Sequence, residues 1–236
     1  MLRGLALVAG VLALAAAPAR ASFPRVAGCV RADFAGVRAV RCGPASGARA
    51  VVVLHGCGGF STFDHRLATE LPRYGIATLY VDYFARTPPP GKRGFCGVWT
   101  RPLGLFSVWE RIAALAAHAL RPHYAHVGAA GWSLGAGVAL AAAEDLHAFD
   151  AVAAFSALAY PPTLERATSL PPSIFLDGGP RDIVPPENAR ALYAAARAAH
   201  VPTALYVYGA GTHDWPGAQG AAGIARAAAF LVRHLR

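Results

Sequence analysis

The chain has 236 residues, of which 55% are hydrophobic and only 15% are charged, so it suits one folded domain with a sizeable core and is not a disordered chain. The formal net charge is +9, carried almost entirely by arginine, with Lys92 as the only lysine. Because the arginines are scattered and form no long basic run, the composition argues against a nucleic-acid partner and favours a dispersed basic surface.

The N-terminus has the parts of a secretory signal peptide. A positively charged start is followed by an unbroken apolar stretch over residues 4–17 and then by an A-x-A cleavage pattern over residues 19–21. The apolar stretch is shorter than the about 20 residues that a membrane span needs. We therefore predict a signal peptide over residues 1–21, a single mature domain over residues 22–236, and a periplasmic or secreted location.

Two other interpretations of the N-terminus remain open. The same segment is an uncleaved anchor if the A-x-A pattern is not cut. Cys29 also follows Val26-Ala27-Gly28, a weak match to a lipoprotein processing site, although Pro24 and Arg25 separate it from the apolar stretch. We expect no stable membrane insertion after removal of the signal.

All four cysteines lie in the predicted mature domain. An even number in an exported protein indicates disulfides, and three connectivities are open. Pairing Cys29 with Cys42 would tie the N-terminal segment to the first strand. Pairing Cys57 with Cys96 would tie the loop after the second strand to the long loop after the third. Four buried free thiols are the alternative.

Along the mature chain, apolar runs of strand length alternate with stretches of helix length. The predicted strands are residues 37–41, 50–55, 76–84, 126–132, 151–158, 173–177 and 203–208. The predicted helices are residues 62–74, 105–120, 134–147, 186–200 and 217–236, and the Pro-rich residues 87–102 and 160–172 are predicted loops. This alternation predicts an α/β domain with a mostly parallel sheet covered by helices on both faces, and a site beyond the carboxyl ends of the strands.

The strongest motif is G-x-S-x-G over residues 131–135, placed where an apolar strand meets an Ala-rich helix. A sharp turn there lifts the hydroxyl of Ser133 above the sheet, which predicts a nucleophile. The amide of Leu134, at the start of the helix, is the predicted first oxyanion donor. The alternative is an ordinary glycine turn in which Ser133 caps the helix.

A glycine-rich loop over residues 55–59 follows an earlier buried strand and allows the backbone to approach a ligand closely. The amide of Cys57 is the predicted second oxyanion donor, with Gly58 as the other candidate. Cys57 lacks the strand–turn–helix setting of a nucleophile. His55 precedes Ser133 in the chain and is interpreted as a structural histidine.

A serine nucleophile needs a base, and the base needs an orienting carboxylate. Asp182 and His213 follow later strands, so both reach the sheet edge of Ser133 and are predicted as acid and base. Asp177 is the alternative acid, but it lies at a strand end before two glycines. The remaining candidates for a base lie on predicted helices and are interpreted as surface residues: His147, His200 and His234.

No motif for a metal or a cofactor appears. The sequence has no H-E-x-x-H, no pair of C-x-x-C motifs and no Walker-type loop, and Gly135-Ala136-Gly137 lacks the later glycine of a dinucleotide fingerprint. We therefore expect neither a cofactor nor a metal.

Taken together, the segments LHGCGGF, VDYF, GWSLG, GGPRDIVPP and GTHDW resemble the dienelactone hydrolase family, over nearly all of the mature chain from about Val51. The resemblance implies an α/β-hydrolase fold. Two positions depart from the family pattern: Ser133 replaces the nucleophilic cysteine, and Ala136 replaces a glycine common in relatives. The first departure shifts the expected chemistry from enol-lactones towards general carboxylic esters.

The resemblance implies hydrolysis of a small ester or lactone through an acyl-enzyme. A serine peptidase of the prolyl-oligopeptidase type and an inactive scaffold used for binding are the alternatives. The loops that carry Cys57 and Cys96 follow consecutive strands and emerge at one sheet edge in such hydrolases, so we predict their disulfide. Whether residues 87–102 form a lid is open. An acyl pocket or core packing is expected for the nearby aromatic residues Tyr83, Phe84, Phe95, Trp99, Phe106 and Trp109.

Overall fold

The computed structural model describes residues 26–236 except 88, 90–93, 97–102 and 160. The predicted signal peptide and Trp99 lie outside the described residues. The strands are β1 (Cys29–Phe34), β2 (Val37–Cys42), β3 (Gly47–Leu54), β4 (Ala77–Val81), β5 (Tyr124–Trp132), β6 (Val152–Phe155), β7 (Ser173–Asp177) and β8 (Thr203–Val207). The helices are α1 (Thr62–Glu70), α2 (Leu103–Leu120), α3 (Leu134–Leu146), α4 (Pro161–Glu165), α5 (Pro186–Ala198) and α6 (Gly217–His234), with 3₁₀ turns η1 (Leu71–Tyr74) and η2 (Ala167–Ser169).

The strands form one eight-stranded sheet in the order β1-β2-β4-β3-β5-β6-β7-β8. From β4 to β8 all neighbouring strands are parallel, whereas β1 and β2 run antiparallel at one edge. The carboxyl ends of the parallel strands therefore meet at one edge of the sheet. This confirms the predicted mostly parallel sheet, in which β3 and β4 lie side by side.

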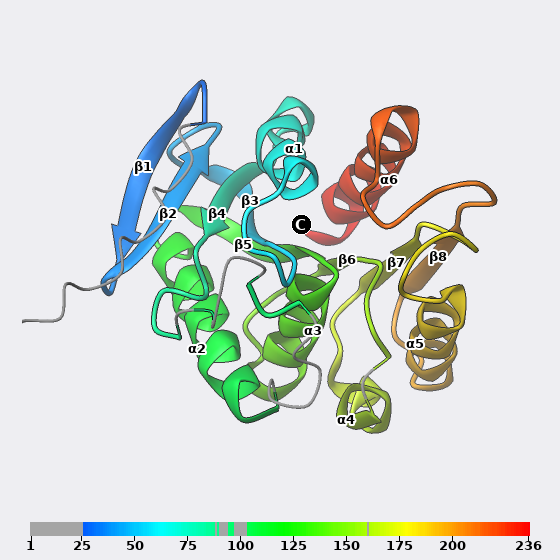
Figure 1. Ribbon diagram of the computed structural model, residues 1–236. Helices are drawn as coiled ribbons and strands as arrows, with labels where there is room; N and C mark the ends of the chain where they lie inside the picture. Colours follow the sequence, from blue (N-terminus) through cyan, green and yellow to red (C-terminus); the bar gives the residue numbers. More distant parts are fainter. Residues whose placement is uncertain (1–25, 88, 90–93, 97–102, 160) are drawn as a thin grey trace, which may run out of the picture.

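Helices cover both faces of the sheet, with α1 and α6 on one side and α2, α3 and α5 on the other (Figure 1). Side chains of β3 alternate between the two layers, because successive residues of a strand point to opposite faces. Val51 and Val53 pack in the core that includes Leu231 of α6, while Val52 packs in the core that includes Trp109 of α2. Burial on both faces explains why β3 reads as a continuous apolar run.

Strand β1 was not predicted. It forms a hairpin with β2 through Ala35 and Gly36, whose φ angles of 50° and 74° suit the tight turns that join antiparallel strands. Cys29 pairs with Cys42 across this hairpin, and a disulfide joins the two residues. The strand is partly exposed and lacks a clear alternation of apolar and polar residues. Its extended conformation is therefore stabilised by the hydrogen bonds to β2, and its own sequence does not mark it as a strand.

Several predicted elements are shorter than expected, among them the strand predicted over residues 151–158, which is only Val152–Phe155, and one helix was missed. The helix over residues 62–74 ends at Glu70 and continues as η1, since Pro72 cannot donate the next helical hydrogen bond. The strand over residues 76–84 ends at Val81. Helix α4 occupies part of the predicted Pro-rich loop. Within the described residues, no helix is both long and apolar enough to cross a membrane.

Candidate active site

Ser133 occupies a strained turn between β5 and α3. Its φ of 54° and ψ of −120° lie outside the regions that a non-glycine residue normally adopts, and such strain is concentrated at functional sites. Its hydroxyl makes no capping hydrogen bond to α3, so the structure does not support the interpretation of Ser133 as an ordinary helix cap. The turn is held by its backbone, since Ser133 N donates to the carbonyl of Phe155 at 2.8 Å.

The two glycines of the motif make this turn possible. A Cβ on Gly131 would lie 2.3 Å from the carbonyl oxygen of Gly135, and a Cβ on Gly135 would lie 2.3 Å from that of Leu54. Either side chain would therefore push α3 away from the sheet. Ala136, where relatives often carry glycine, is fully buried in α3.

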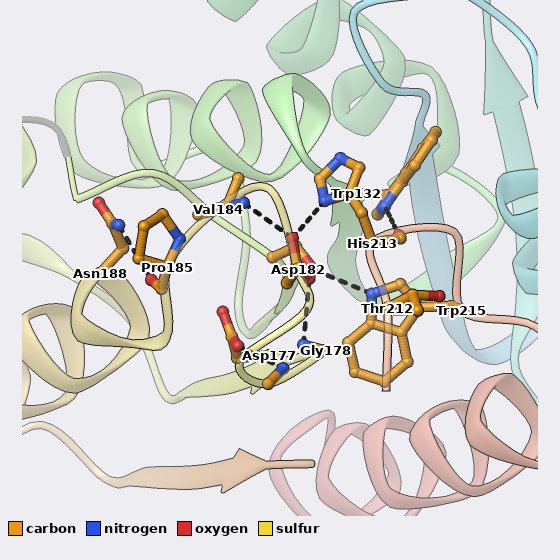
Figure 2. Close-up of polar contacts among 12 residues, drawn as sticks. Trp132, Asp177, Gly178, Asp182, Val184, Pro185, Asn188, Thr212, His213 and Trp215 are labelled. Atoms are coloured by element: carbon orange, nitrogen blue, oxygen red, sulfur yellow. Dashed lines mark hydrogen bonds and ion pairs between the residues drawn. The ribbon is translucent and has the colours of Figure 1, made fainter. Parts of the chain in front are cut away.

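Asp182 and His213 form a hydrogen-bonded pair, with 2.6 Å between Asp182 Oδ1 and His213 Nδ1. The pair comes from the loops after β7 and β8, which brings together residues 31 positions apart in the chain. The backbone amide of Val184 also donates to Oδ1, at 2.9 Å, and the amide of Gly178 donates to Oδ2, at 3.2 Å (Figure 2). The Asp182 carboxylate is thus fixed by both its loop and the histidine.

The electrostatics keep Asp182 ionised. Burial raises the pKa of its carboxyl, but hydrogen bonds from His213, Ser156 and Val184 outweigh burial and hold the pKa below its ordinary value. An ionised carboxylate on Nδ1 orients the imidazole and leaves Nε2 as the ring nitrogen that can accept a proton.

Asp177, the alternative acid, is placed differently. Its Oδ1 accepts a hydrogen bond from the amide of Gly179 at 2.7 Å, and it makes no hydrogen bond to His213 among the contacts of the described residues. Burial raises the pKa of Asp177 to about 6. The geometry therefore favours Asp182 as the partner of the histidine.

Trp132, the residue before Ser133, joins the loops of the site. Its indole Nε1 donates to the backbone carbonyl of His213 at 2.9 Å, and the two ring centroids are 5.1 Å apart (Figure 2). On its other side, a Cβ on Gly56 would lie 2.7 Å from the indole. Trp132 therefore packs between the histidine loop and the glycine-rich loop.

Gln219 of α6 was missed by the sequence analysis. Its side-chain amide both accepts from Thr212 N and donates to Thr212 O, each at 3.0 Å, and so fixes the loop that carries His213. No motif marks such a contact, because it depends on where α6 packs.

The glycine-rich loop after β3 is also ordered by specific contacts. The carbonyl of Cys57 accepts a hydrogen bond from Phe95 N at 2.7 Å, and a Cβ on Gly94 would lie 2.2 Å from the same oxygen. Within the described part of the chain, the amides of Cys57 and Leu134 donate no hydrogen bond to the protein.

A disulfide joins Cys57 to Cys96, with Cα atoms 5.0 Å apart, as predicted. Together with the Cys29–Cys42 bond, it leaves no free cysteine among the described residues. The sulfur of Cys57 is therefore not a nucleophile in this structure. The bond anchors residues 94–96 directly beside the glycine-rich loop.

Removing this disulfide is expected to lower both stability and turnover. The double variant Cys57→Ser/Cys96→Ser should lose about 3–4 kcal/mol of unfolding free energy on the chain-entropy model. Its kcat should fall about 10-fold or more, since the disulfide no longer holds the Cys57 amide, which is the predicted oxyanion donor, in place. Denaturant unfolding and ester kinetics measure the two effects.

The matched control is Cys29→Ser/Cys42→Ser, which removes the disulfide of the edge hairpin. It should lose about 3 kcal/mol of stability by the same reasoning and keep the wild-type kcat. A variant without Cys57–Cys96 that keeps full turnover would show that the bond does not position the loop.

His55 is a structural histidine, as the sequence suggested. It is fully buried, stacks on Tyr83 with ring centroids 4.2 Å apart, and its Nδ1 lies 2.9 Å from the carbonyl oxygen of Gly56. Burial lowers its pKa to about 4, so the ring is neutral at physiological pH. Its contact with the carbonyl of Gly56 therefore supports the glycine-rich loop from within the core.

Most of the aromatic residues predicted near the site belong to the core. Four of them are buried in the core layer that includes α2: Tyr83, Phe84, Phe95 and Trp109. Phe106 is partly buried and packs against this layer. Core packing is thus the correct interpretation for these four. Among the described residues, no group of histidine, cysteine, aspartate or glutamate side chains is arranged to hold a metal ion.

Comparison with known proteins assigns the family. The sequence profile of the dienelactone hydrolase family matches residues 37–231. No curated protein sequence matches the chain.

Solved structures share the fold at low sequence identity. A dienelactone hydrolase from Anabaena variabilis is 20% identical, with a TM-score of 0.66 over 88% of this chain and 97% of that chain. An esterase from Pyrococcus furiosus is 18% identical, with a TM-score of 0.67 over 88% and 92%. A puromycin-hydrolyzing peptidase from Mycobacterium tuberculosis is 20% identical, with a TM-score of 0.68 over 91% of this chain and 41% of that chain.

These likenesses establish the fold, and the profile match covers most of the chain. The sheet order, the helices on both faces and the strained turn after β5 agree with it. The protein has the α/β-hydrolase fold, and it belongs to the dienelactone hydrolase family.

Proposed function

We propose that the protein is an exported serine hydrolase that cleaves a carboxylic ester or a lactone through an acyl-enzyme. The observation that carries the proposal is the strained turn at Ser133 on the same sheet edge as the Asp182–His213 pair. A serine, a histidine and a carboxylate in this chain order match the order of the α/β-hydrolase triad.

In the first step, His213 takes the proton of Ser133 through Nε2 while its Nδ1 remains bonded to Asp182. The serine oxygen attacks the carbonyl carbon, and the alcohol leaves with the proton from His213. Water then attacks the acyl-enzyme with His213 again as base, which releases the acid and restores Ser133.

The amides of Cys57 and Leu134 are the proposed donors to the oxyanion. Leu134 lies at the N-terminus of α3, where the helix dipole favours negative charge. Removal of one such donor typically costs about 2.7–4 kcal/mol of transition-state stabilisation. The disulfide to Cys96 and the hydrogen bond from Phe95 support the placement of the Cys57 amide.

A fluorophosphonate probe tests the proposal directly. We expect one covalent adduct per chain, mapped by peptide mass spectrometry to Ser133, together with hydrolysis of p-nitrophenyl acetate. Absence of both labelling and hydrolysis in folded protein would favour an inactive binding scaffold.

A peptidase is the second candidate, since the structural relatives include the puromycin-hydrolyzing peptidase. The same triad can cleave amides, so the substrate decides between the two functions. We expect p-nitrophenyl esters to be cleaved and peptide anilides to be poor substrates. The reverse order of kcat/KM would assign the protein to the peptidases.

Export is supported by the two disulfides, which form and persist in oxidising compartments. We expect the mature N-terminus at Ser22, since the A-x-A pattern precedes it. Intact-mass analysis of protein from the periplasm or medium measures this. Cys29 is bonded to Cys42, which occupies the sulfur that a lipid would need. A mass that includes residues 1–21, or a diacylglycerol group on Cys29, would contradict the prediction.

A further inference from the structure

On the side away from His213, Asp182, the proposed acid, is held by two residues from other parts of the chain. Ser156, directly after β6, donates from Oγ to Asp182 Oδ2 at 2.6 Å, and Trp215 donates from Nε1 to Ser156 Oγ at 2.9 Å. We propose that Trp215 and Ser156 form a positioning relay that aims the carboxylate of Asp182 at His213. The inference rests on the proposed function and adds two positioning residues to it.

The direction of each hydrogen bond in the relay follows from the donor types. An indole N–H can only donate, so Ser156 Oγ must accept from Trp215. The hydroxyl has a single proton, and the carboxylate of Asp182 is the acceptor at its other contact. Trp215 therefore commits Ser156 to act as a donor to Asp182.

Ser156 makes the shorter of the two contacts to Oδ2. Without its hydroxyl, Oδ2 would keep only the 3.2 Å contact with the amide of Gly178. The carboxylate would then turn more easily about its Cβ–Cγ bond and weaken the 2.6 Å contact between Oδ1 and His213. Ser156 thus acts on the histidine through Asp182.

Both relay residues have a strained backbone. Ser156 has a φ of 47° and Trp215 a φ of 50°, which are uncommon for residues other than glycine. Backbone hydrogen bonds hold each conformation, from Ser156 N to the carbonyl of Leu176 at 2.7 Å and from Trp215 N to that of Thr212 at 3.3 Å. Such strain persists where the surroundings fix it, as at functional sites.

The indole of Trp215 is buried and packed tightly on several sides. It is 1% exposed and contacts the rings of Phe63, Phe155 and Tyr208, with centroids 5.1 to 5.5 Å apart. A Cβ on Gly223 of α6 would lie 2.6 Å from it. The donor to Ser156 is therefore rigid.

The relay also closes on itself. Trp215 lies two positions after His213, so the contacts from His213 through Asp182 and Ser156 return to the loop that carries the base. A closed set of contacts fixes the acid relative to the base more tightly than a single hydrogen bond can.

The test begins with the ester kinetics of Ser156→Ala. Loss of a hydrogen bond to a charged group should lower kcat by about 10- to 100-fold and leave KM within about twofold of the wild type. The acidic limb of the pH profile should move to higher pH, because Ser156 helps to hold the pKa of Asp182 down.

Two further variants separate the effect of losing the Ser156 hydroxyl from the effects of its strained backbone and of losing any buried hydroxyl. Ser156→Gly also removes the hydroxyl but relieves the left-handed backbone, so it should be at least as stable as Ser156→Ala and lose as much kcat. Ser173→Ala is the control, because it removes the hydroxyl of another buried serine, at the amino end of β7 and so at the end of the strands away from the site. The lost hydrogen bond runs from Ser173 Oγ to the carbonyl of Pro171. This control should keep the wild-type kcat and pH profile.

Trp215→Phe keeps an aromatic ring and removes the donor, so we expect a loss in kcat of about 3- to 10-fold. Because Trp215 acts through Ser156, the double variant Ser156→Ala/Trp215→Phe should be no slower than Ser156→Ala alone. If the losses in kcat of the two single variants multiply in the double variant, the relay is overturned. A wild-type kcat and pH profile in Ser156→Ala would also overturn it.

A readout independent of turnover is the low-field NMR resonance of the His213 Nδ1 proton. It should broaden and exchange faster with water in Ser156→Ala than in Ser173→Ala, and an unchanged resonance would overturn the relay. A wild type that neither binds the fluorophosphonate nor cleaves esters would refute the proposed function alone. An active wild type with a fully active Ser156→Ala would refute the relay alone.

Discussion

Replacement of Ser133 by alanine is expected to lower the kcat for ester hydrolysis by on the order of 10⁶-fold, because the members of a triad act as a unit. The hydroxyl caps no helix, so its removal leaves no broken structural contact. Alanine tolerates the left-handed backbone about as poorly as serine does, and the change in unfolding free energy should stay below about 1 kcal/mol. Single-turnover and steady-state assays with p-nitrophenyl acetate measure the loss.

Denaturant unfolding of Ser133→Ala provides the control for its fold, and the fluorophosphonate should no longer label the variant. Retention of most of the activity would refute the nucleophile assignment. Because Cys57 is bonded to Cys96, its sulfur is not an alternative nucleophile in the oxidised protein.

Asp182→Asn is expected to have the second largest effect, a loss of about 10⁴-fold in kcat with little change in fold. An amide presents an N–H₂ group or a single oxygen where Asp182 accepts hydrogen bonds at both oxygens. The imidazole then favours the wrong tautomer and loses its stabilising charge. Unsatisfied donors around the amide should also cost about 1–3 kcal/mol of stability. Steady-state kinetics and thermal unfolding measure the two effects.

Asp177→Asn is the matched control, since it changes the other buried carboxyl nearby, at the end of β7 and just before the loop that carries Asp182. It should keep kcat within about threefold of the wild type, because among the described residues the Asp177 carboxylate accepts its hydrogen bond from Gly179 N and makes none to His213. A loss as large as that of Asp182→Asn would assign the acid role to Asp177 instead.

The stability of Asp177→Asn should depend on pH in a defined direction. Burial raises the pKa of Asp177 to about 6, so its ionisation is less favourable in the folded than in the unfolded state. This group therefore costs the wild type stability as the pH rises from about 4 through the folded pKa. The stability gain of the variant over the wild type should grow across that interval and stay constant above it.

The sharp turn at Ser133 and the mostly parallel sheet followed from local sequence. A continuous apolar run such as β3 can be buried only between two layers, and G-x-S-x-G at a strand–helix boundary leaves little freedom to the backbone. The positions of Asp182 and His213 after later strands followed from the same rule, because parallel strands end at one edge. The break of α1 at Pro72 was also present in the sequence, as a proline inside a predicted helix.

Tertiary structure alone decided the contacts that orient these residues. Ser156 and Trp215 are 59 positions apart, and Gln219 contacts the histidine loop from α6, so no local pattern marks them. The sequence already favoured Asp182 over Asp177, but the contact between Asp182 and His213 is made only where the loops after β7 and β8 meet. Periodicity and turn chemistry act over a few residues, whereas these contacts arise only when the sheet and α6 have packed.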